Sequence, residues 1–298
     1  MTRIVSIDGS LRPPAEATVS VYDRGFLYGD SVFETVRTYG GEPFALDAHM
    51  ARLARSAERV FIAMPVPPAA FAMEIRLAVR AARNPESYAR AMLTRGSGPV
   101  GLDPSLAGAP LRVVLVEPLA PLPAAVYREG VGVVLVRTQR AADSAAQGAK
   151  VGNYLASLLA LKQAREAGAH EALVLDAAGR VVEGTTSNVF LVQGGAIVTP
   201  PVEAGILPGI TRAHLLEVAA ELGRAVRCEA ITPADVLAAS EVFLSSTLRE
   251  VVPVVTVDGR PVGGGAPGPV TRALHAAFRT RIGLGGEPMP WEAGATAP

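Results

Sequence analysis

The chain has 298 residues, of which 49% are hydrophobic and 19% are charged, and its formal net charge is zero. This length suits one large or two modest domains, and the zero net charge excludes the basic footprint that nucleic acids and acidic membranes attract, so we expect neither as a partner. The single cysteine, Cys228, excludes an internal disulfide and a cysteine-rich metal site and fits a reducing cytoplasm.

Residues 1–117 predict a small domain that mixes strands and helices. Apolar residues alternate, or end at glycine-rich turns, where strands are expected. They recur at helical spacing where helices are expected, with Asp47 placed to cap the first helix. The predicted strands are 4–7, 17–22, 31–39 and 111–117, and the predicted helices are 47–61 and 69–83.

Prolines at 118, 121 and 123 follow, and neither a helix nor a central strand accommodates them, so 118–126 is expected to be an interdomain loop. A larger domain is expected over 127–286, with helices closed by Gly168 and Gly223. The glycine- and proline-rich end, 287–298, is expected to be a flexible tail. The fold class is therefore α/β (α+β) with two domains. The larger domain's predicted strands are 131–136, 172–176, 188–192 and 242–245, and its predicted helices are 153–167 and 211–222.

Lysine is nearly absent, because only Lys150 and Lys162 occur among 28 basic residues. Arginine replaces lysine on solvated surfaces but not in imine chemistry, where a neutral amine must attack a carbonyl. Lys162 has Glu166 four residues further along the predicted helix, which favours a surface ion pair. Lys150 stands just ahead of that helix with Tyr154 four residues later, so the two side chains share a face if the helix begins there.

Other polar motifs follow Lys150 in order. Glu183 heads the turn Glu-Gly-Thr-Thr-Ser-Asn after a strand, and Leu207-Pro-Gly-Ile-Thr-Arg opens the helix at 211–222. The sequence Leu244-Ser-Ser-Thr-Leu ends a strand in a hydroxyl-rich turn. Free backbone N–H groups at a helix start of this kind form a phosphate site.

Together with Val21-Tyr-Asp-Arg-Gly-Phe-Leu-Tyr-Gly-Asp-Ser-Val-Phe-Glu near the amino end and Gly268-Pro-Val-Thr-Arg near the carboxyl end, these motifs resemble the fold-type IV pyridoxal-phosphate enzymes. That family includes branched-chain and D-amino acid aminotransferases and aminodeoxychorismate lyase. The resemblance covers nearly the whole chain. It implies a small α/β domain, a larger cofactor-binding domain with a barrel-like sheet, pyridoxal 5′-phosphate as cofactor, and a homodimer or higher homo-oligomer.

The resemblance also implies roles for individual residues. Lys150 matches the catalytic lysine that binds the cofactor covalently and moves a proton, and Glu183 matches the carboxylate that pairs with the pyridine nitrogen. Tyr154 matches the tyrosine that contacts the cofactor's phenolic oxygen. The phosphate-binding positions implied by the resemblance are Arg52, Ile210, Thr211, Ser246 and Thr247. No metal site is expected, because the four histidines are scattered.

The substrate-binding positions favour an amino acid and a 2-oxo acid as substrates. Tyr88-Ala-Arg90 resembles the tyrosine-x-arginine strand of branched-chain aminotransferases. D-amino acid aminotransferases carry an arginine and a histidine where this chain has Val100 and Leu102. The pocket and carboxylate positions implied by the resemblance are Tyr28, Phe33, Arg37, Tyr88, Arg90 and Leu248, with Arg95 as a further candidate for the carboxylate.

Some features depart from the branched-chain pattern. Thr35 stands where that group has glycine, and the Glu183 turn resembles the D-enzyme version. The main hypothesis is a ping-pong transaminase that moves the amino group of an aliphatic, branched-chain L-amino acid to 2-oxoglutarate. The alternatives are a D-amino acid or (R)-amine transaminase, then aminodeoxychorismate lyase, and, in a different class, an inactive cofactor- or ligand-binding homologue.

Overall fold

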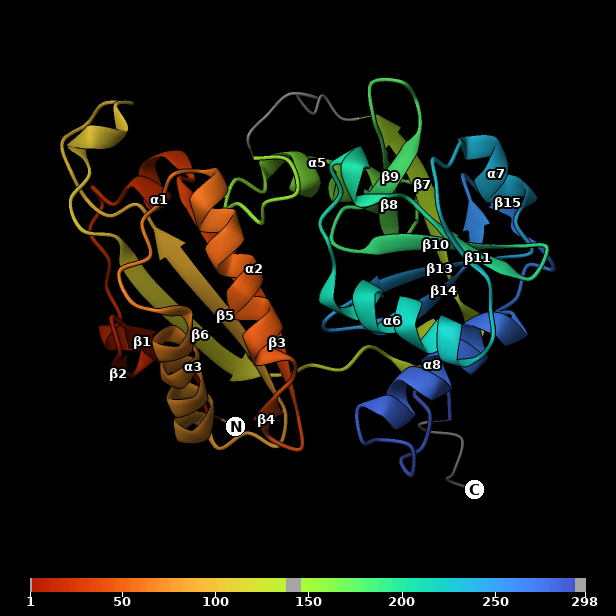
Figure 1. The fold of residues 1–298 in the computed structure, drawn as a ribbon, viewed down its shortest axis with the longest axis horizontal. Helices are drawn as coiled ribbons and strands as arrows, with labels where there is room; N and C mark the ends of the chain where they lie inside the picture. Colours follow the sequence, from red (N-terminus) through yellow and green to blue (C-terminus); the bar gives the residue numbers. More distant parts are fainter. Residues whose placement is uncertain (1, 138–145, 293–298) are drawn as a thin grey trace. The chain divides into compact units, whose positions relative to one another are not determined.

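Both halves of the chain contain strands and helices in the computed structural model, which describes residues 2–137 and 146–292 (Figure 1). Within these residues the chain forms two compact units, one of residues 2–120 with 146–154 and the other of residues 121–137 with 155–292. The α/β (α+β) class predicted from the sequence is confirmed.

The first unit is a six-stranded sheet with the strand order β2-β1-β6-β5-β3-β4, in which neighbouring strands are antiparallel. Helices α2 and α3 pack on one face (Figure 1), because alternate residues of β3 and β5, such as Val36 and Leu93, point into a core shared with Leu53 and Phe71. Its elements are β1 (Ile4–Ile7), β2 (Ser10–Arg12), η1 (Pro14–Glu16), α1 (Arg24–Tyr28), β3 (Ser31–Tyr39), β4 (Glu42–Pro43), α2 (Leu46–Arg59), α3 (Pro68–Ala82), β5 (Ser87–Thr94), η2 (Pro104–Leu106) and β6 (Leu111–Pro118).

The second unit is a nine-stranded sheet with the order β12-β11-β10-β13-β14-β7-β8-β9, and β15 pairs with β14. Strand β9, at one end of this order, also contacts β10 near the other end, so the sheet is curled. Helices α6 and α8 pack against each other and against β13 (Figure 1). Its elements are α4 (Ala124–Glu129), β7 (Val131–Arg137), α5 (Leu155–Glu166), β8 (Glu171–Leu175), β9 (Val181–Gly184), β10 (Asn188–Gln193), β11 (Ala196–Thr199), η3 (Val202–Ala204), α6 (Ile210–Glu221), β12 (Val226–Cys228), α7 (Pro233–Ala238), β13 (Glu241–Ser246), β14 (Glu250–Val257), β15 (Arg260–Pro261) and α8 (Pro269–Arg281).

The segment around Lys150 lies against β3 of the first unit, whereas the sequence analysis placed it within the larger domain, 127–286. The amide of Phe33 donates to the carbonyl of Lys150 at 2.9 Å, and the amide of Gly152 donates to the carbonyl of Ser31 at 2.7 Å. Val151 packs against the first unit's core. Backbone pairing therefore fixes this segment to a strand more than a hundred residues earlier in the chain.

Two local predictions in the first unit are wrong. Residues 17–22 form no strand, and Val19, Val21 and Tyr22 are exposed, because the alternating pattern has no neighbouring strand to pair with. Asp47 does not cap α2: the cap residue is Ala45, in a left-handed conformation, and Asp47 lies in the first turn. Its charge still suits the positive end of the helix dipole.

Residues 287–292, the described part of the expected flexible tail, lie against α8. The ring of Trp291 makes an edge contact with that of His275, with centroids 5.5 Å apart, and Arg272 stands over the Trp291 ring at 5.7 Å. The rest of the expected tail, 293–298, lies outside the described residues. Among the helices described, none has the length and apolar character needed to cross a membrane.

Candidate active site

Lys150 and Tyr154 come together in the first unit, although not on a helix. The Nζ of Lys150 donates to the hydroxyl of Tyr154 at 3.4 Å, while α5 begins only at Leu155. The predicted helical face is therefore wrong for this pair, and an irregular segment produces the contact instead. Both side chains also contact Phe33: Lys150 Nζ stands 4.6 Å from its ring centroid, and the Tyr154 ring packs edge-on at 5.2 Å.

Arg90 joins this group from β5. Its guanidinium stands 3.7 Å from the Phe33 ring centroid, so a permanent cation and the Lys150 amine share one aromatic neighbour. In contrast, the Arg37 guanidinium stacks over Tyr39 at 4.1 Å. Tyr88 lies directly opposite Arg37 in the β3–β5 pairing, which places the side chains of both residues on the same face of the sheet as Arg90.

Arg95, the further carboxylate candidate, is occupied by contacts within the protein. Its guanidinium makes two hydrogen bonds to Asp30, at 2.6 and 2.9 Å, and donates to the carbonyls of Val60 and Phe61. These partners hold the end of β5 and the end of α2 together. Arg95 therefore acts as a structural residue in this arrangement, because little of its donor capacity remains for a substrate.

Tyr28 lies under the loop that carries Val100 and Leu102. Its hydroxyl accepts from the amide of Gly101 at 3.1 Å, and Arg24 donates to the carbonyls of Gly101 at 2.8 Å and Leu102 at 3.2 Å. Val100 and Leu102 are 71% and 80% exposed. The loop is thus fixed by its backbone and presents two apolar side chains outward.

Arg52, the predicted phosphate-binding arginine, is buried in a charged cluster with Glu34 and His49. Its Nε and Nη2 each donate to Glu34 at 2.7 Å, and His49 Nδ1 lies 2.8 Å from the same carboxylate. Burial alone would raise the pKa of Glu34, but the charge and hydrogen bonds of Arg52 and His49 lower that pKa to about 2. Burial lowers the pKa of His49, which keeps the ring neutral at pH 7.

This cluster makes stability depend on pH. The Glu34 pKa of about 2 lies below its ordinary value of 4.5, so its contribution to stability is complete above pH 4.5 and is lost as the pH falls towards 2. The lowered pKa of His49 acts with the same sign, beginning below its ordinary value of 6.5. For Glu34→Gln we expect the free energy of unfolding at pH 7 to fall by about 3 kcal/mol, because the buried guanidinium of Arg52 loses its counter-charge.

Urea unfolding from pH 3 to 7 measures this effect. Wild type should lose stability steeply below pH 4.5, and Glu34→Gln should show a flatter profile there. Equal slopes for the two proteins in this range would contradict the assignment. Glu42→Gln, which removes an exposed carboxylate from the neighbouring strand β4, is the matched control and should leave the wild-type slope unchanged.

Glu183 is the predicted pyridine partner and lies at the end of β9 in the second unit. It is 8% exposed, and its Oε2 accepts from the amide of Leu207 at 3.0 Å. That hydrogen bond ties the carboxylate to the segment leading into α6. A carboxylate in this place is oriented by backbone and is poorly solvated, which strengthens its interaction with a cationic partner.

The start of α6 carries Ile210 and Thr211 in its first turn. The N-cap residue is Gly209, so no side-chain hydrogen bond caps this end of the helix. A Cβ at Gly209 would lie 2.0 Å from Oδ1 of Asn188, so only glycine permits this close approach. In contrast, the first amides of α8 donate to the buried carboxylate of Glu241. The start of α6 has no such side-chain cap and suits an anion, and the phosphate site that the motif predicts there stays a prediction.

Ser246, Thr247 and Leu248 lie where β13 turns into β14. The turn is held by Arg249, whose Nε donates to the hydroxyl of Ser246 at 2.9 Å and whose Nη1 donates to Glu171 at 2.6 Å. Arg249 and Glu171 were not among the site residues predicted from the sequence. The available signal was weak: an arginine directly after the hydroxyl-rich turn, and one acidic residue at the head of the apolar strand β8.

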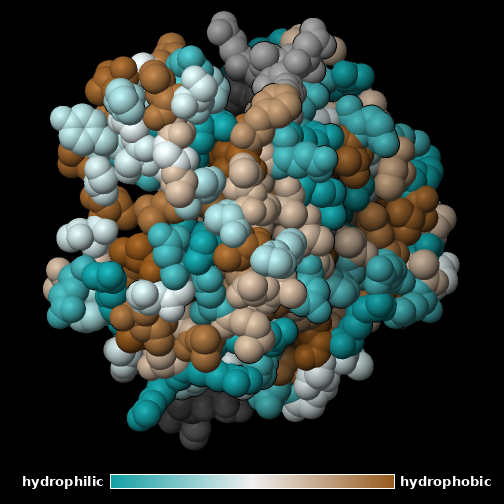
Figure 2. Space-filling model, turned by 60° about the vertical axis from the view of Figure 1, so that its left-hand side comes forward, coloured by the Kyte–Doolittle hydropathy of each residue, from teal (hydrophilic) through white to brown (hydrophobic). Residues whose placement is uncertain are grey.

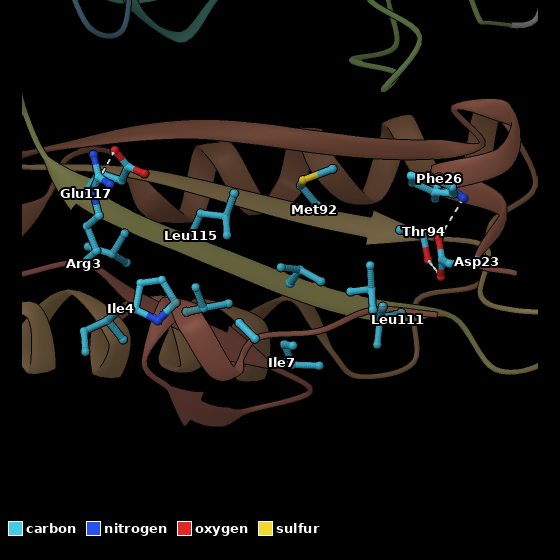
Figure 3. A pocket seen from close by; sticks show the side chains of 17 residues that line it. Arg3, Ile4, Ile7, Asp23, Phe26, Met92, Thr94, Leu111, Leu115 and Glu117 are labelled. Carbon is cyan, nitrogen blue, oxygen red and sulfur yellow. Dashed lines mark hydrogen bonds and ion pairs between the residues drawn. The ribbon is translucent and has the colours of Figure 1, made fainter. Parts of the chain in front are cut away.

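A separate cavity of about 470 Å³ opens on the first unit beside β1, β5 and β6. Figure 3 shows Arg3 and Glu117 together at one end and Asp23, Thr94 and Phe26 at the other, with apolar side chains between them. None of the site residues predicted from the sequence lines this cavity among the described parts of the chain. Its walls are mostly aliphatic, so it offers little chemistry.

The predicted pairing of Lys162 with Glu166 is confirmed. The two side chains are in hydrogen-bonding contact on α5, and both are more than 60% exposed. A pair this exposed contributes little to stability. Of the chain's two lysines, therefore, only Lys150 has an environment that suggests chemistry.

Comparison with known proteins finds the same family that the ordered motifs resemble. A model of the family Amino-transferase class IV matches residues 31–257. The branched-chain-amino-acid aminotransferase of Escherichia coli K12 is 34% identical over 270 residues, which are 88% of this chain and 87% of that protein. The D-alanine aminotransferase of Bacillus licheniformis is 32% identical over 284 residues, 93% of this chain and 96% of that protein.

A solved structure shows the same fold. The branched-chain aminotransferase of the archaeon Thermoproteus uzoniensis, with norvaline, is 32% identical, with a TM-score of 0.87 over 97% of this chain and 97% of that one. The likeness therefore extends over both units, each with its own part of the motif set. The chain belongs to the class IV aminotransferases, the family that its ordered motifs resemble.

Proposed function

We propose that this aminotransferase binds pyridoxal 5′-phosphate through Lys150 and transfers the amino group of an aliphatic, branched-chain L-amino acid to 2-oxoglutarate. The observation that carries the proposal is the placement of Lys150 Nζ, 3.4 Å from the Tyr154 hydroxyl and over the Phe33 ring beside Arg90. A neutral amine in such a position can form an imine, which the chain's many arginines cannot do.

The donor sets of the two units fit the chemistry of this cofactor. In the second unit, the start of α6 and the hydroxyls of Ser246 and Thr247 suit a phosphate, and Glu183 suits a protonated pyridine nitrogen. In the first unit, the Tyr154 hydroxyl suits a phenolic oxygen, and Arg52 offers a cation held in place by Glu34. The proposal assigns each set to the corresponding part of the cofactor.

When bound, the cofactor supplies an electron sink for negative charge on the substrate's Cα. Lys150 Nζ would take the proton from the substrate's Cα and deliver it to the cofactor's C4′, a task that needs an amine that can titrate. Tyr154 donates or accepts at that amine and orients it. Glu183, as a carboxylate, keeps a proton on the ring nitrogen. The amino acid leaves as its oxo acid before the second oxo acid binds, which makes the kinetics ping-pong.

In the first unit, the substrate pocket is assigned to the face of the sheet opposite α2 and α3, where Phe33 and Tyr88 lie. Tyr28 of this unit and Leu248 of the second unit are the other substrate-binding positions that the resemblance implies. Of the three candidate arginines, Arg90 is favoured for the carboxylate because it shares Phe33 with Lys150, whereas Arg37 stacks on Tyr39 and Arg95 binds Asp30. A planar guanidinium suits a carboxylate in two-point contact.

For Arg90→Ala we therefore expect KM for 2-oxoglutarate to rise about 100-fold, the loss expected for a charge-assisted hydrogen-bonded pair. Arg37→Ala is the matched comparison, and a smaller rise is expected there. Steady-state kinetics with L-leucine and 2-oxoglutarate measures both values. Transamination that survives both substitutions unchanged would remove arginine-based carboxylate binding from the proposal.

A D-amino acid or (R)-amine transaminase is the second candidate. The Glu183 turn and the relative that is a D-alanine aminotransferase favour it, while Val100 and Leu102 do not. Aminodeoxychorismate lyase and an inactive homologue rank below these. The deciding experiment incubates the purified enzyme with L-leucine, D-alanine, an (R)-arylalkylamine and aminodeoxychorismate in turn and follows the visible absorption of the bound cofactor. Bleaching by L-leucine is expected, and bleaching by D-alanine alone would replace the main proposal.

The proposal includes a homodimer or higher homo-oligomer in the cytoplasm. Val100 and Leu102 are exposed in the single chain, and apolar side chains occur in several places on the face seen in Figure 2. Such exposed apolar side chains suit burial against another copy of the chain. Light scattering on the purified protein measures the mass of the assembly.

A further inference from the structure

Two turns of the second unit lie side by side at one end of its sheet. The turn at 185–187 leads from β9 into β10, and the turn at 247–249 leads from β13 into β14. Strands β10 and β13 are antiparallel, with Asn188 opposite Ser245, so the start of one meets the end of the other. The residue before the first turn is Gly184, which follows Glu183, and the second turn begins at Thr247.

Glu171, at the head of β8, holds the first turn. Its Oε1 accepts from the amide of Thr186 at 2.7 Å, from the hydroxyl of Ser187 at 2.9 Å and from the hydroxyl of Thr185 at 3.1 Å. The residue is 1% exposed. Burial would raise the pKa of Glu171, but the charge of Arg249 and these hydrogen bonds lower it, so the group is a carboxylate at neutral pH.

Arg249 joins this carboxylate to both turns. Its Nη1 donates to Glu171 Oε2 at 2.6 Å, and its Nη2 donates to the hydroxyl of Thr186 at 2.9 Å and to the carbonyl of Thr186 at 3.3 Å. Its Nε donates to the hydroxyl of Ser246 at 2.9 Å, and Nη1 also lies 3.5 Å from His170 Nε2. Each nitrogen of the guanidinium therefore has a partner within the chain.

This pattern separates Arg249 from a substrate-binding arginine. A guanidinium whose nitrogens are all engaged has little capacity left for a substrate carboxylate. In addition, Ser246 uses its oxygen as acceptor toward Arg249, which leaves its hydroxyl hydrogen to donate elsewhere. The contact thus orients the Ser246 hydroxyl as a donor, the role that a phosphate oxygen requires.

We propose that Arg249 and Glu171 are a pair of positioning residues that lock the turns at 185–187 and 247–249 together and so hold Glu183, Ser246 and Thr247 in the geometry that binds the cofactor. This inference rests on the cofactor assignment proposed above. The pair acts through other groups and touches neither cofactor nor substrate. Because one ion pair, between the buried Glu171 and the partly exposed Arg249, spans both turns, loss of either member loosens both.

The experiment compares the dissociation constant of pyridoxal 5′-phosphate from wild type, Arg249→Ala, Glu171→Gln and the double variant, each first freed of cofactor. Titration followed by visible absorption gives the constant, and displacement by inorganic phosphate reports on the phosphate-binding groups alone. We expect each single variant to bind the cofactor about 10- to 100-fold more weakly, as for loss of one charge-assisted network. The double variant should be no weaker than the weaker single variant, because the two residues act as a unit.

The matched control is Arg180→Ala. Arg180 also pairs with a carboxylate in the same unit, that of Asp176, but the pair is exposed and lies within a single hairpin. We expect wild-type cofactor affinity for this variant. Arg249→Lys should fall between wild type and Arg249→Ala, since a single ammonium can reach Glu171 but cannot also serve Ser246 and Thr186.

Thermal unfolding of the cofactor-free proteins measures the stability of each variant, so that a loss of cofactor affinity can be told apart from a general loss of stability. A loss of affinity in Arg249→Ala and Glu171→Gln, with inorganic phosphate binding weakened in parallel, supports the inference. Affinity within twofold of wild type in both variants overturns it. A double variant whose loss of cofactor affinity equals the sum of the two single losses also overturns it. If Arg249→Ala does not fold, wild-type cofactor affinity in both Arg249→Lys and Glu171→Gln overturns it. If wild type itself binds no cofactor, the proposed function fails instead.

Discussion

Lys150→Arg is expected to abolish transamination while leaving the fold of both units intact. The change keeps a positive charge near Phe33 and Tyr154, so the local electrostatics stay close to those of wild type. A guanidinium cannot form an imine or exchange a proton with Cα, because it stays protonated at any pH at which the protein folds. We expect kcat to fall by about four orders of magnitude.

Turnover of L-leucine with 2-oxoglutarate measures this effect, and borohydride trapping measures the covalent link to the cofactor. Lys162→Arg is the matched control, because it changes the chain's other lysine, on the exposed face of α5, and should leave both readings at wild-type values. A Lys150→Arg variant that still gives a borohydride-fixed adduct and turns over would show that another group performs the chemistry.

The scarcity of lysine reduced the candidates for the imine-forming residue to two, and the ordered motifs around Lys150 favoured that one. Replacement of almost every lysine by arginine leaves ammonium groups only where arginine cannot serve or where chance has kept them. Exposure separates the two remaining residues, since Lys162 has only Glu166 beside it while Lys150 lies among Tyr154, Phe33 and the backbone of β3. Composition alone could not have ranked them.

Regular elements were predictable where one face of a helix or strand is buried. The strand at 31–39 and the helices near 46–59 and 68–82 follow their apolar periodicity closely. Residues 17–22 show the limit, because alternation predicts a strand only if a neighbouring strand is available to pair with it. Similarly, the pairing of Lys150 and Gly152 with β3 depends on backbone hydrogen bonds that leave no pattern in the side chains.

The roles of residues that depend on a partner far along the chain could not be predicted from the sequence either. Arg95 resembled a substrate-binding arginine by its motif, yet Asp30 and the end of α2 occupy it. Arg249 looked like an ordinary turn residue, yet Glu171, 78 positions earlier, makes it part of a network. A motif fixes which residue types stand near the site, but only the fold decides which of them remain available to a ligand.

Glu183→Gln is expected to separate binding of the cofactor from its activation. Glutamine has nearly the same shape, and its amide oxygen can still accept from the amide of Leu207, so the end of β9 and the approach to α6 keep their geometry. A neutral amide cannot hold a proton on a pyridine nitrogen as a carboxylate does, so the electron sink is weakened. We expect kcat to fall about 1,000-fold, the scale of losing one preorganised electrostatic group.

Cofactor affinity in this variant should fall much less than kcat, since the proposed phosphate-binding groups at Thr211 and Thr247 are unchanged. Stopped-flow bleaching with L-leucine measures the first half-reaction, and the absorption maximum of the bound cofactor reports its protonation state. The control is Glu203→Gln, in the exposed helix η3 of the same unit, for which wild-type kinetics are expected. A Glu183→Gln variant with wild-type kcat and an unshifted absorption maximum would assign the pyridine-binding carboxylate to another residue.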